Sequence, residues 1–169
     1  MALLTLISFA FLSFSNSTIA QDKKAEKKKE KAQQIKSIVE DSVKYVFAAE
    51  IAIPQAGNMR NLTYGYDVTI TKDTINSYLP YFGRAYGGIE FGSTKSPLDF
   101  ISTKFNYESK SKKKTNGWDI NIEIKDQTDV RKMIFSIFDN GSATLDVFFN
   151  SRSQISFNGY VKAVTPKKS

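Results

Sequence analysis

Residues 133–149 read MIFSIFDNGSATLDVFF, and this stretch decides the fold. Apolar residues recur at every second position on both sides of a central Asp139-Asn140-Gly141. Strict alternation is the signature of a strand with one face in the core and one in solvent. Asn-Gly is a strong hairpin signal, because both central positions of the tightest hairpin turn need a positive φ. The stretch therefore predicts two antiparallel strands, with Ile137 and Leu145 pointing into one core.

The same two-residue period recurs along most of the chain. Further alternating runs cover residues 45–53, 64–70, 75–79, 105–108, 118–125 and 155–161. In the first run, Phe47, Ala49, Ile51 and Ile53 are expected on one face. The connections are too short for crossover helices. We therefore predict a mainly β fold: an antiparallel meander of about eight strands that forms a strongly curved sheet or barrel.

A helix is predicted before the first strand, over residues 21–44. This segment is rich in Lys, Glu, Ala and Gln, which are strong helix formers. Its apolar residues fall only in the second half, at Ile35, Ile38, Val39 and Val43. We expect an exposed first half and a second half that packs against an end or open side of the sheet. Residues 45–164 then form a single β domain, and residues 165–169 a tail.

The first twenty residues resemble a secretory signal peptide. Residues 2–14 are uncharged and mostly apolar, and small residues follow at Thr18 and Ala20. The run is shorter than the about 20 apolar residues of a membrane-spanning helix. We expect residues 1–20 to be removed by cleavage before Gln21, giving a periplasmic or secreted chain without a transmembrane span. The alternative is an uncleaved membrane anchor.

The chain contains no histidine and no cysteine. This composition excludes Ser-His-Asp and Cys-His catalysis, ordinary zinc sites, disulfides and lipid attachment through cysteine. We predict no catalytic residue, no metal and no cofactor. The formal net charge is +7, but the lysines cluster near the N-terminus, in one loop and in the tail. Such clusters are usually solubilising, so nucleic acid is not an expected partner.

An aromatic segment, Tyr78-Leu79-Pro80-Tyr81-Phe82-Gly83-Arg84-Ala85-Tyr86, precedes a long Gly-rich loop that we expect over residues 83–102. Pro80 cannot donate to a sheet, and Gly83 permits a sharp bend. The segment is either a structural corner, in which Arg84 bonds loop carbonyls, or the mouth of a ligand site with stacking aromatics. The candidate ligand-binding residues are Tyr78, Tyr81, Phe82, Arg84 and Tyr86.

Two other sets of residues could carry chemistry. Asp119, Glu123 and Asp146 could supply the paired carboxylates of a glycosidase, but they alternate with apolar residues and are expected on the solvated face. Ser42 and Thr74 lie in Asp-Ser/Thr-apolar triplets, which resemble O-glycosylation sites of some exporting bacteria.

The segment at 79–86 resembles the central motif of the domain-of-unknown-function family DUF4251, small exported proteins of Gram-negative bacteria. The resemblance continues through residues 87–91, 137–141 and 155–161. It covers nearly the whole domain and implies export, but no reaction, cofactor or catalytic residue.

These observations favour a non-catalytic binding module of the cell envelope. Its partner is expected to be an anionic or glycan ligand or an envelope protein. Two alternatives stay open: a carboxylate-dependent enzyme that acts on glycans, and a structural envelope protein that acts through its basic helix.

Overall fold

The computed structural model describes residues 16–63, 65–86, 95–112 and 116–164, with the backbone alone for residues 16–22. Most of the predicted signal segment, residues 87–94 of the Gly-rich loop and the tail lie outside the described residues. Helix α1 (Asn16–Lys36) continues into a π-helical turn, η1 (Ser37–Asp41). The strands are β1 (Tyr45–Pro54), β2 (Arg60–Asn61), β3 (Asp67–Ile70), β4 (Ile75–Tyr78), β5 (Asp99–Ser102), β6 (Phe105–Lys112), β7 (Gly117–Ile124), β8 (Val130–Phe138), β9 (Ser142–Phe149) and β10 (Ile155–Ala163).

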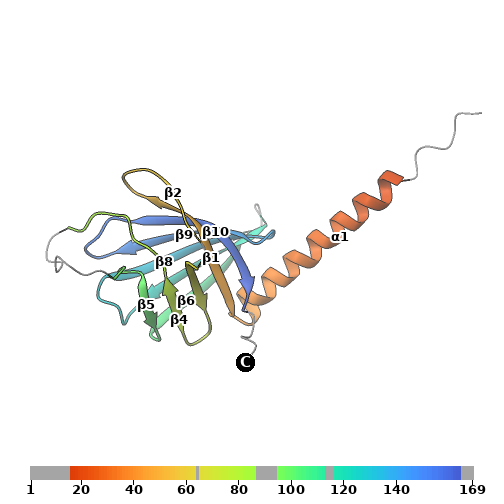
Figure 1. The fold of residues 1–169 in the computed structure, drawn as a ribbon. Coiled ribbons are helices and arrows are strands. Elements are labelled where there is room, and N and C mark those ends of the chain that lie inside the picture. Colours follow the sequence, from red (N-terminus) through yellow and green to blue (C-terminus); the bar gives the residue numbers. More distant parts are fainter. Residues whose placement is uncertain (1–15, 64, 87–94, 113–115, 165–169) are drawn as a thin grey trace, which may run out of the picture.

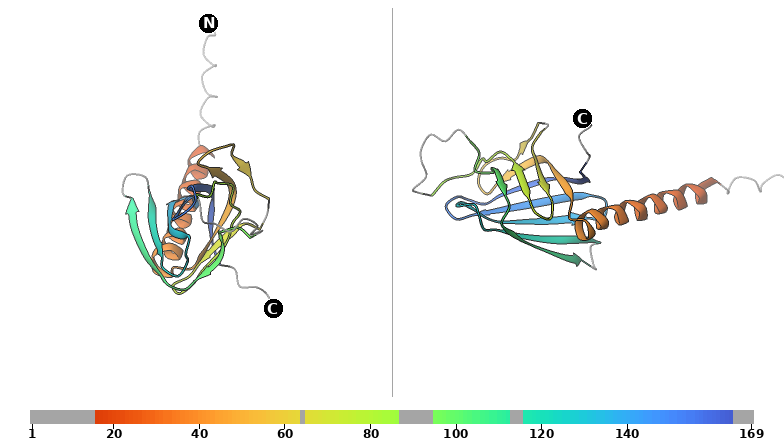
Figure 2. Two further views of the ribbon diagram at one scale, coloured as in Figure 1. Left: turned by 90° about the vertical axis from the view of Figure 1, so that its left-hand side faces the viewer. Right: turned by 90° about the horizontal axis from the view of Figure 1, so that it is seen from below.

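All ten of these strands belong to one sheet, and every pair is antiparallel. The order is β5-β4-β3-β1-β10-β9-β8-β7-β6, with β2 paired to β1 beside this path. The strands thus follow one another around a ring in sequence order, because the last strand, β10, pairs with the first, β1. Figure 2 shows the sheet curving back on itself. The predicted meander, a nearly closed barrel-like sheet, is confirmed.

The ring is open at one place, between β5 and β6. These strands are consecutive in the chain, yet each pairs only with its other neighbour among the described strands. Asp126 holds the turn that connects β5 to β6: its carboxylate accepts from the Ser102 hydroxyl and from the backbone N–H groups of Thr103 and Lys104. These bonds, the Ser102 hydroxyl first, lower the pKa of the Asp126 carboxyl. The ionised Asp126 carboxylate therefore stabilises the fold above its unfolded-state pKa, and this stabilisation is lost as the pH falls through its lower, folded-state pKa.

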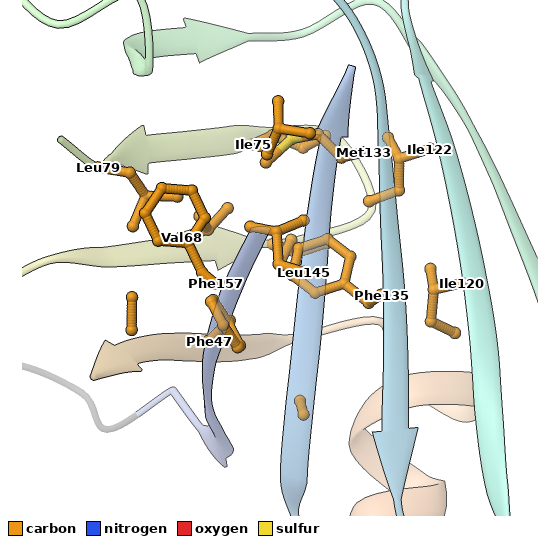
Figure 3. Packing of buried hydrophobic residues seen from close by; sticks show 14 of the residues in the cluster. Phe47, Val68, Ile75, Leu79, Ile120, Ile122, Met133, Phe135, Leu145 and Phe157 are labelled. Carbon is orange, nitrogen blue, oxygen red and sulfur yellow. The ribbon is translucent and has the colours of Figure 1, made fainter. Parts of the chain in front are cut away.

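The inside of the barrel is filled by aliphatic and aromatic side chains. Figure 3 shows Phe47, Phe135 and Phe157 meeting there. Phe135 is fully buried, and its ring contacts Tyr45 and Phe47 edge to face, with centroids 6.4 and 5.5 Å apart. This geometry is favourable for aromatic pairs. Ile137 and Leu145 are both buried in this core, as the hairpin pattern predicts.

The inward face of β1 changes part-way along the strand. Phe47 and Ala49 are buried as expected, but Ile51 and Ile53 are only half-buried, and Ala52 is buried in their place. A β-bulge between Ala49 and Ile51 inserts one extra residue against β10 and reverses the alternation. The expectation of one face for Phe47, Ala49, Ile51 and Ile53 is therefore wrong. The strands pass very close at the bulge, since a Cβ on Gly159 would lie 2.0 Å from the Ala48 carbonyl oxygen.

The turn between β8 and β9 also differs from the expected type. Gly141 has a φ of +85°, but Asn140 is not among the residues with positive φ. The Gly141 N–H donates to the Phe138 carbonyl at 2.9 Å, which makes a three-residue loop in which only the glycine needs a left-handed conformation. The Asn140 side chain instead accepts from the Ser142 N–H at 2.9 Å. The hairpin is confirmed, but the prediction that both turn residues have positive φ is wrong.

Helix α1 extends away from one end of the barrel, and only its last turns pack against it (Figure 1). The side chains of residues 23–31 are exposed, whereas Ile35 and Val39 are buried. Polar bonds fix the packed part: Tyr107 donates to the Val39 carbonyl at 2.9 Å, and the Trp118 indole N–H donates to Glu40 at 2.7 Å. Burial raises the pKa of Tyr107 to about 12. Within the described residues no helix combines the length and hydrophobicity needed to cross a membrane.

Two short strands escape the sequence pattern. β2 has two residues, and β5 falls inside the segment expected to be an irregular loop. The expected Gly83–Ser102 loop therefore ends before Asp99. β5 shows no apolar alternation, because its buried positions beside β4 are Phe100 and Ser102, while the apolar Ile101 is exposed.

Candidate functional site

The aromatic segment begins where β4 ends. Tyr78 is the last residue of that strand, and Leu79 after it is buried. The Leu79 N–H still bonds the Leu98 carbonyl at 3.2 Å, but Pro80 has no N–H with which to continue the ladder. The chain therefore leaves the sheet at Pro80.

Tyr81 holds the bend that follows. Its hydroxyl lies 2.8 Å from the Ser153 carbonyl, 3.0 Å from the Arg84 carbonyl and 3.1 Å from the Ser153 hydroxyl. Gly83 is needed beside it, because a Cβ there would lie 2.1 Å from the Tyr81 hydroxyl. The loop carbonyls are thus bonded by Tyr81, the contact that the structural-corner interpretation gave to Arg84.

Backbone bonds tie the same bend to the loop between β9 and β10. The Ser153 N–H donates to the Arg84 carbonyl at 2.9 Å, and the Arg84 N–H donates to the Ser153 hydroxyl at 2.9 Å. The Tyr86 N–H donates to the Ser151 carbonyl at 2.8 Å. Arg84 therefore holds the corner with its backbone, while its side chain is exposed.

A shallow open groove of about 470 Å³ lies beside this corner. Its lining combines aromatic rings, prolines and a few charged or hydroxyl groups: Tyr66, Tyr78, Leu79, Pro80, Tyr81, Lys95, Ser96, Pro97, Asp99 and Arg152. Tyr66 and Tyr78 stack, with ring centroids 5.5 Å apart and planes 21° from parallel. Tyr78 is nonetheless 51% exposed, so the groove presents an aromatic surface to solvent.

Two basic residues, Lys95 and Arg152, line the groove, and Arg152 is paired. Arg152 lies over the Tyr81 ring, 5.5 Å from its centroid, and donates through Nε to Asp129. Asp129 also accepts from the N–H and hydroxyl of Ser151. Burial is the main cause that raises the pKa of Tyr81, so its phenol stays protonated at neutral pH. The Arg152–Asp129 pair leaves little net charge at the inner wall.

The structure brings together only some of the predicted site residues. Tyr78 and Tyr81 line the groove, whereas Phe82, Arg84 and Tyr86 are not among its lining residues. The Phe82 ring instead packs against the core and lies under Arg60, whose guanidinium carbon is 4.6 Å from the ring centroid. Tyr86 is 60% exposed.

Sequence reasoning missed the rest of the groove. Tyr66 was visible only as one residue of an alternating run, and Arg152 lies in a loop far along the chain. Arg152 reaches the aromatic segment through an isolated bridge with Ala85. No local sequence pattern connects these residues, because they come together only where segments that are far apart in the chain meet.

The other candidate residues lie elsewhere. Asp119 accepts from the Ser136 hydroxyl at 2.9 Å and pairs with Lys112, while Asp146 accepts from Ser156. Neither lines the groove, and Glu123 is exposed. Ser42 is exposed after η1, and Thr74 is half-buried in the turn between β3 and β4. Within the described residues no cluster of carboxylates could hold a metal ion.

A second hollow, of about 550 Å³, lies between α1 and the β8–β9 turn. It is lined by Lys24, Ala25, Lys27, Lys28, Lys31 and Asn140. Lys28 reaches Asp139 at 3.7 Å but remains largely exposed, so this ion pair contributes little to stability.

Comparisons with known proteins agree with the fold. A crystal structure of a DUF4251 family protein from Bacteroides eggerthii DSM 20697 superimposes with a TM-score of 0.55 at 10% sequence identity. The match covers 79% of this chain and 88% of that one. At this identity the likeness shows the fold alone. No curated protein matches the chain. Residues 26–161 match the profile described as a domain of unknown function, DUF4251, and the chain therefore belongs to the DUF4251 family.

Proposed function

We propose that this protein is an exported, non-catalytic binding module whose ligand site is the groove beside Tyr78 and Tyr81. The observation that carries the proposal is the half-exposed Tyr66–Tyr78 stack, in a groove where hydrogen bonds hold the lining residues Tyr81 and Arg152. Ligand sites combine apolar and aromatic lining with a few placed polar groups. Here Lys95, Ser96 and Asp99 supply those groups among the lining residues.

The chemistry of the groove favours a glycan ligand. Tyrosine rings provide flat apolar faces on which a sugar ring can stack, and hydroxyl and charged groups can bond its hydroxyls. A strongly anionic ligand is less well matched, because Arg152 already pairs with Asp129 and the groove lining contains Asp99 as well as Lys95.

The carboxylate-enzyme alternative has weaker support. A glycosidase needs two carboxyl groups within about 5–9.5 Å across a cleft. Asp99 is the one carboxylate among the described lining residues. Asp119 and Asp146 are held by Lys112 and Ser156 outside the groove. The alternative that acts through the basic helix rests on the exposed lysines of residues 23–31.

Replacing Tyr78 with alanine should weaken glycan binding about three- to tenfold, because one aromatic face is lost. Isothermal titration calorimetry with a panel of neutral and acidic oligosaccharides, including peptidoglycan fragments, measures this change. Tyr86→Ala is the matched control, since Tyr86 is also an exposed tyrosine but does not line the groove. Equal losses in both variants, or no binding by the wild type across the panel, would contradict the proposal.

Export is tested separately. Helix α1 begins at Asn16, so cleavage before Gln21 would shorten the helix without touching its packed end at Ile35. Intact-mass spectrometry of protein from its native host should show a chain that starts at Gln21. A chain that still carries residues 2–14 would retire the signal-peptide prediction.

A further inference from the structure

Strand β6 (Phe105–Lys112) has one edge that no described strand covers. It pairs with β7 along its whole length, from Phe105 opposite Ile124 to Lys112 opposite Gly117. It is the last strand of the sheet path, and β5 on the other side of the opening does not pair with it. An unpaired edge of eight residues is a ready template for another strand.

The hydrogen-bonding pattern shows which groups this edge presents. The Lys125 N–H donates to the Lys104 carbonyl at 2.8 Å, which fixes the bonded pairs of β6 and β7 at even-numbered residues of β6. The N–H and C=O groups of Phe105, Tyr107, Ser109 and Ser111 therefore point away from β7. In the described part of the chain no backbone bond is made to these groups from the open side.

The sequence of this edge is complementary to itself. Consider two antiparallel copies centred on Ser109. Tyr107 then faces Ser111 of the partner subunit, so outward-pointing backbone groups meet on both strands. In the same register Glu108 faces Lys110 of the partner subunit, and Lys110 faces the partner subunit's Glu108. Directly opposite unlike charges stabilise a strand pair, and like charges destabilise it.

The two charged side chains beside Ser109 are available for this contact. Glu108 and Lys110 are exposed, and neither forms an ion pair among the described residues, since Lys112 takes Asp119. The Ser109 hydroxyl oxygen is buried and has no hydrogen-bond partner. Such an atom is costly to leave unpaired. The Ser109 side chain lies on the inner face of the sheet, opposite the buried Ile120, so the contact between the two copies rests on the backbone and the two charge pairs.

We propose that this protein forms a two-fold symmetric dimer in which the open edges of β6 pair antiparallel through Ser109. Lysines on an edge strand ordinarily prevent pairing, because they repel one another. The Glu108-Ser109-Lys110 order reverses this effect for a second copy of this chain, since Lys110 then meets the partner subunit's Glu108, while Lys112 is already paired with Asp119. The interface is small, so the dimer should be a weak and concentration-dependent one.

Sedimentation velocity of the full chain over a concentration series, up to millimolar, tests the proposal. The wild type should shift from monomer to dimer. Glu108→Lys and Lys110→Glu should each raise the dimer dissociation constant by about tenfold or more, because like charges then face each other at both ends of the contact. An equimolar mixture of the two variants should form a heterodimer, and the Glu108→Lys/Lys110→Glu double variant should dimerise again.

Two further variants separate edge pairing from general charge effects. Ser109→Pro removes an N–H that points away from β7, so it should abolish the dimer and leave the β6–β7 ladder intact. Glu123→Lys makes the same charge change on an exposed residue of β7 and should leave the dimer unchanged. A wild type that stays monomeric throughout, or a dimer insensitive to Ser109→Pro and to both charge reversals, would overturn the proposal.

Discussion

Replacing Phe135 with alanine is expected to lower the free energy of unfolding by about 3–5 kcal/mol, the usual cost of truncating a buried phenylalanine. Phe135 is fully buried and contacts Tyr45 and Phe47 from the far side of the barrel. The cavity left by the missing ring would lie between β8 and β1. These strands are not neighbours in the sheet, so no backbone hydrogen bonds between them can draw them together to fill it. Urea unfolding followed by circular dichroism measures the loss.

The matched control for this variant is Phe138→Ala. Phe138 ends the same strand, but its side chain is 39% exposed and points to the outer face. Its truncation removes much less buried surface, so the free energy of unfolding should fall by no more than about 1 kcal/mol. Similar losses in both variants would mean that the centre of the core lies elsewhere.

The second large effect is expected from the helix. Deleting residues 21–31 removes exposed side chains and should cost less than about 1 kcal/mol. Extending the deletion through Val43 also removes the buried Ile35 and Val39, each worth about 1.5–3 kcal/mol. The longer deletion also removes Glu40, so the Trp118 indole N–H loses its hydrogen-bond acceptor. Thermal unfolding of the two deletions should therefore differ clearly.

An Ile35→Ala/Val39→Ala variant separates lost packing from lost chain. It keeps the helix and the Glu40 bond to Trp118, but removes most of the buried aliphatic surface. The thermal stability of this variant should lie between those of the two deletion variants. Equal stability of the short and the long deletion would show that the packed half of the helix has been misplaced.

Local pattern was sufficient where a strand keeps one register along its whole length, as β7 does. Trp118, Ile120 and Ile122 alternate with polar residues, and all three are buried as the pattern predicts. The pattern failed along β1, because the bulge opposite Gly159 reverses the inward face after Ala49. The extra residue of a bulge is recognised only against the partner strand, which the sequence does not identify.

The candidate site shows the same division. The sequence indicated that the chain leaves the sheet at Pro80 and bends at Gly83, because those residues restrict or free the backbone locally. It could not indicate that Tyr81 would bond Ser153, or that Arg152 would line the groove instead of Arg84. Those contacts depend on the loop between β9 and β10 lying beside the end of β4.

The sequence by itself therefore determined the fold class, the antiparallel meander and the absence of histidine and cysteine chemistry. These follow from side-chain period and composition, which are local properties. Only the tertiary structure determined where the sheet is open, between β5 and β6, that the edge around Ser109 is unpaired among the described strands, and which residues line the aromatic groove. Each of these depends on which distant segments meet, and that is set by closure of the barrel around one shared core.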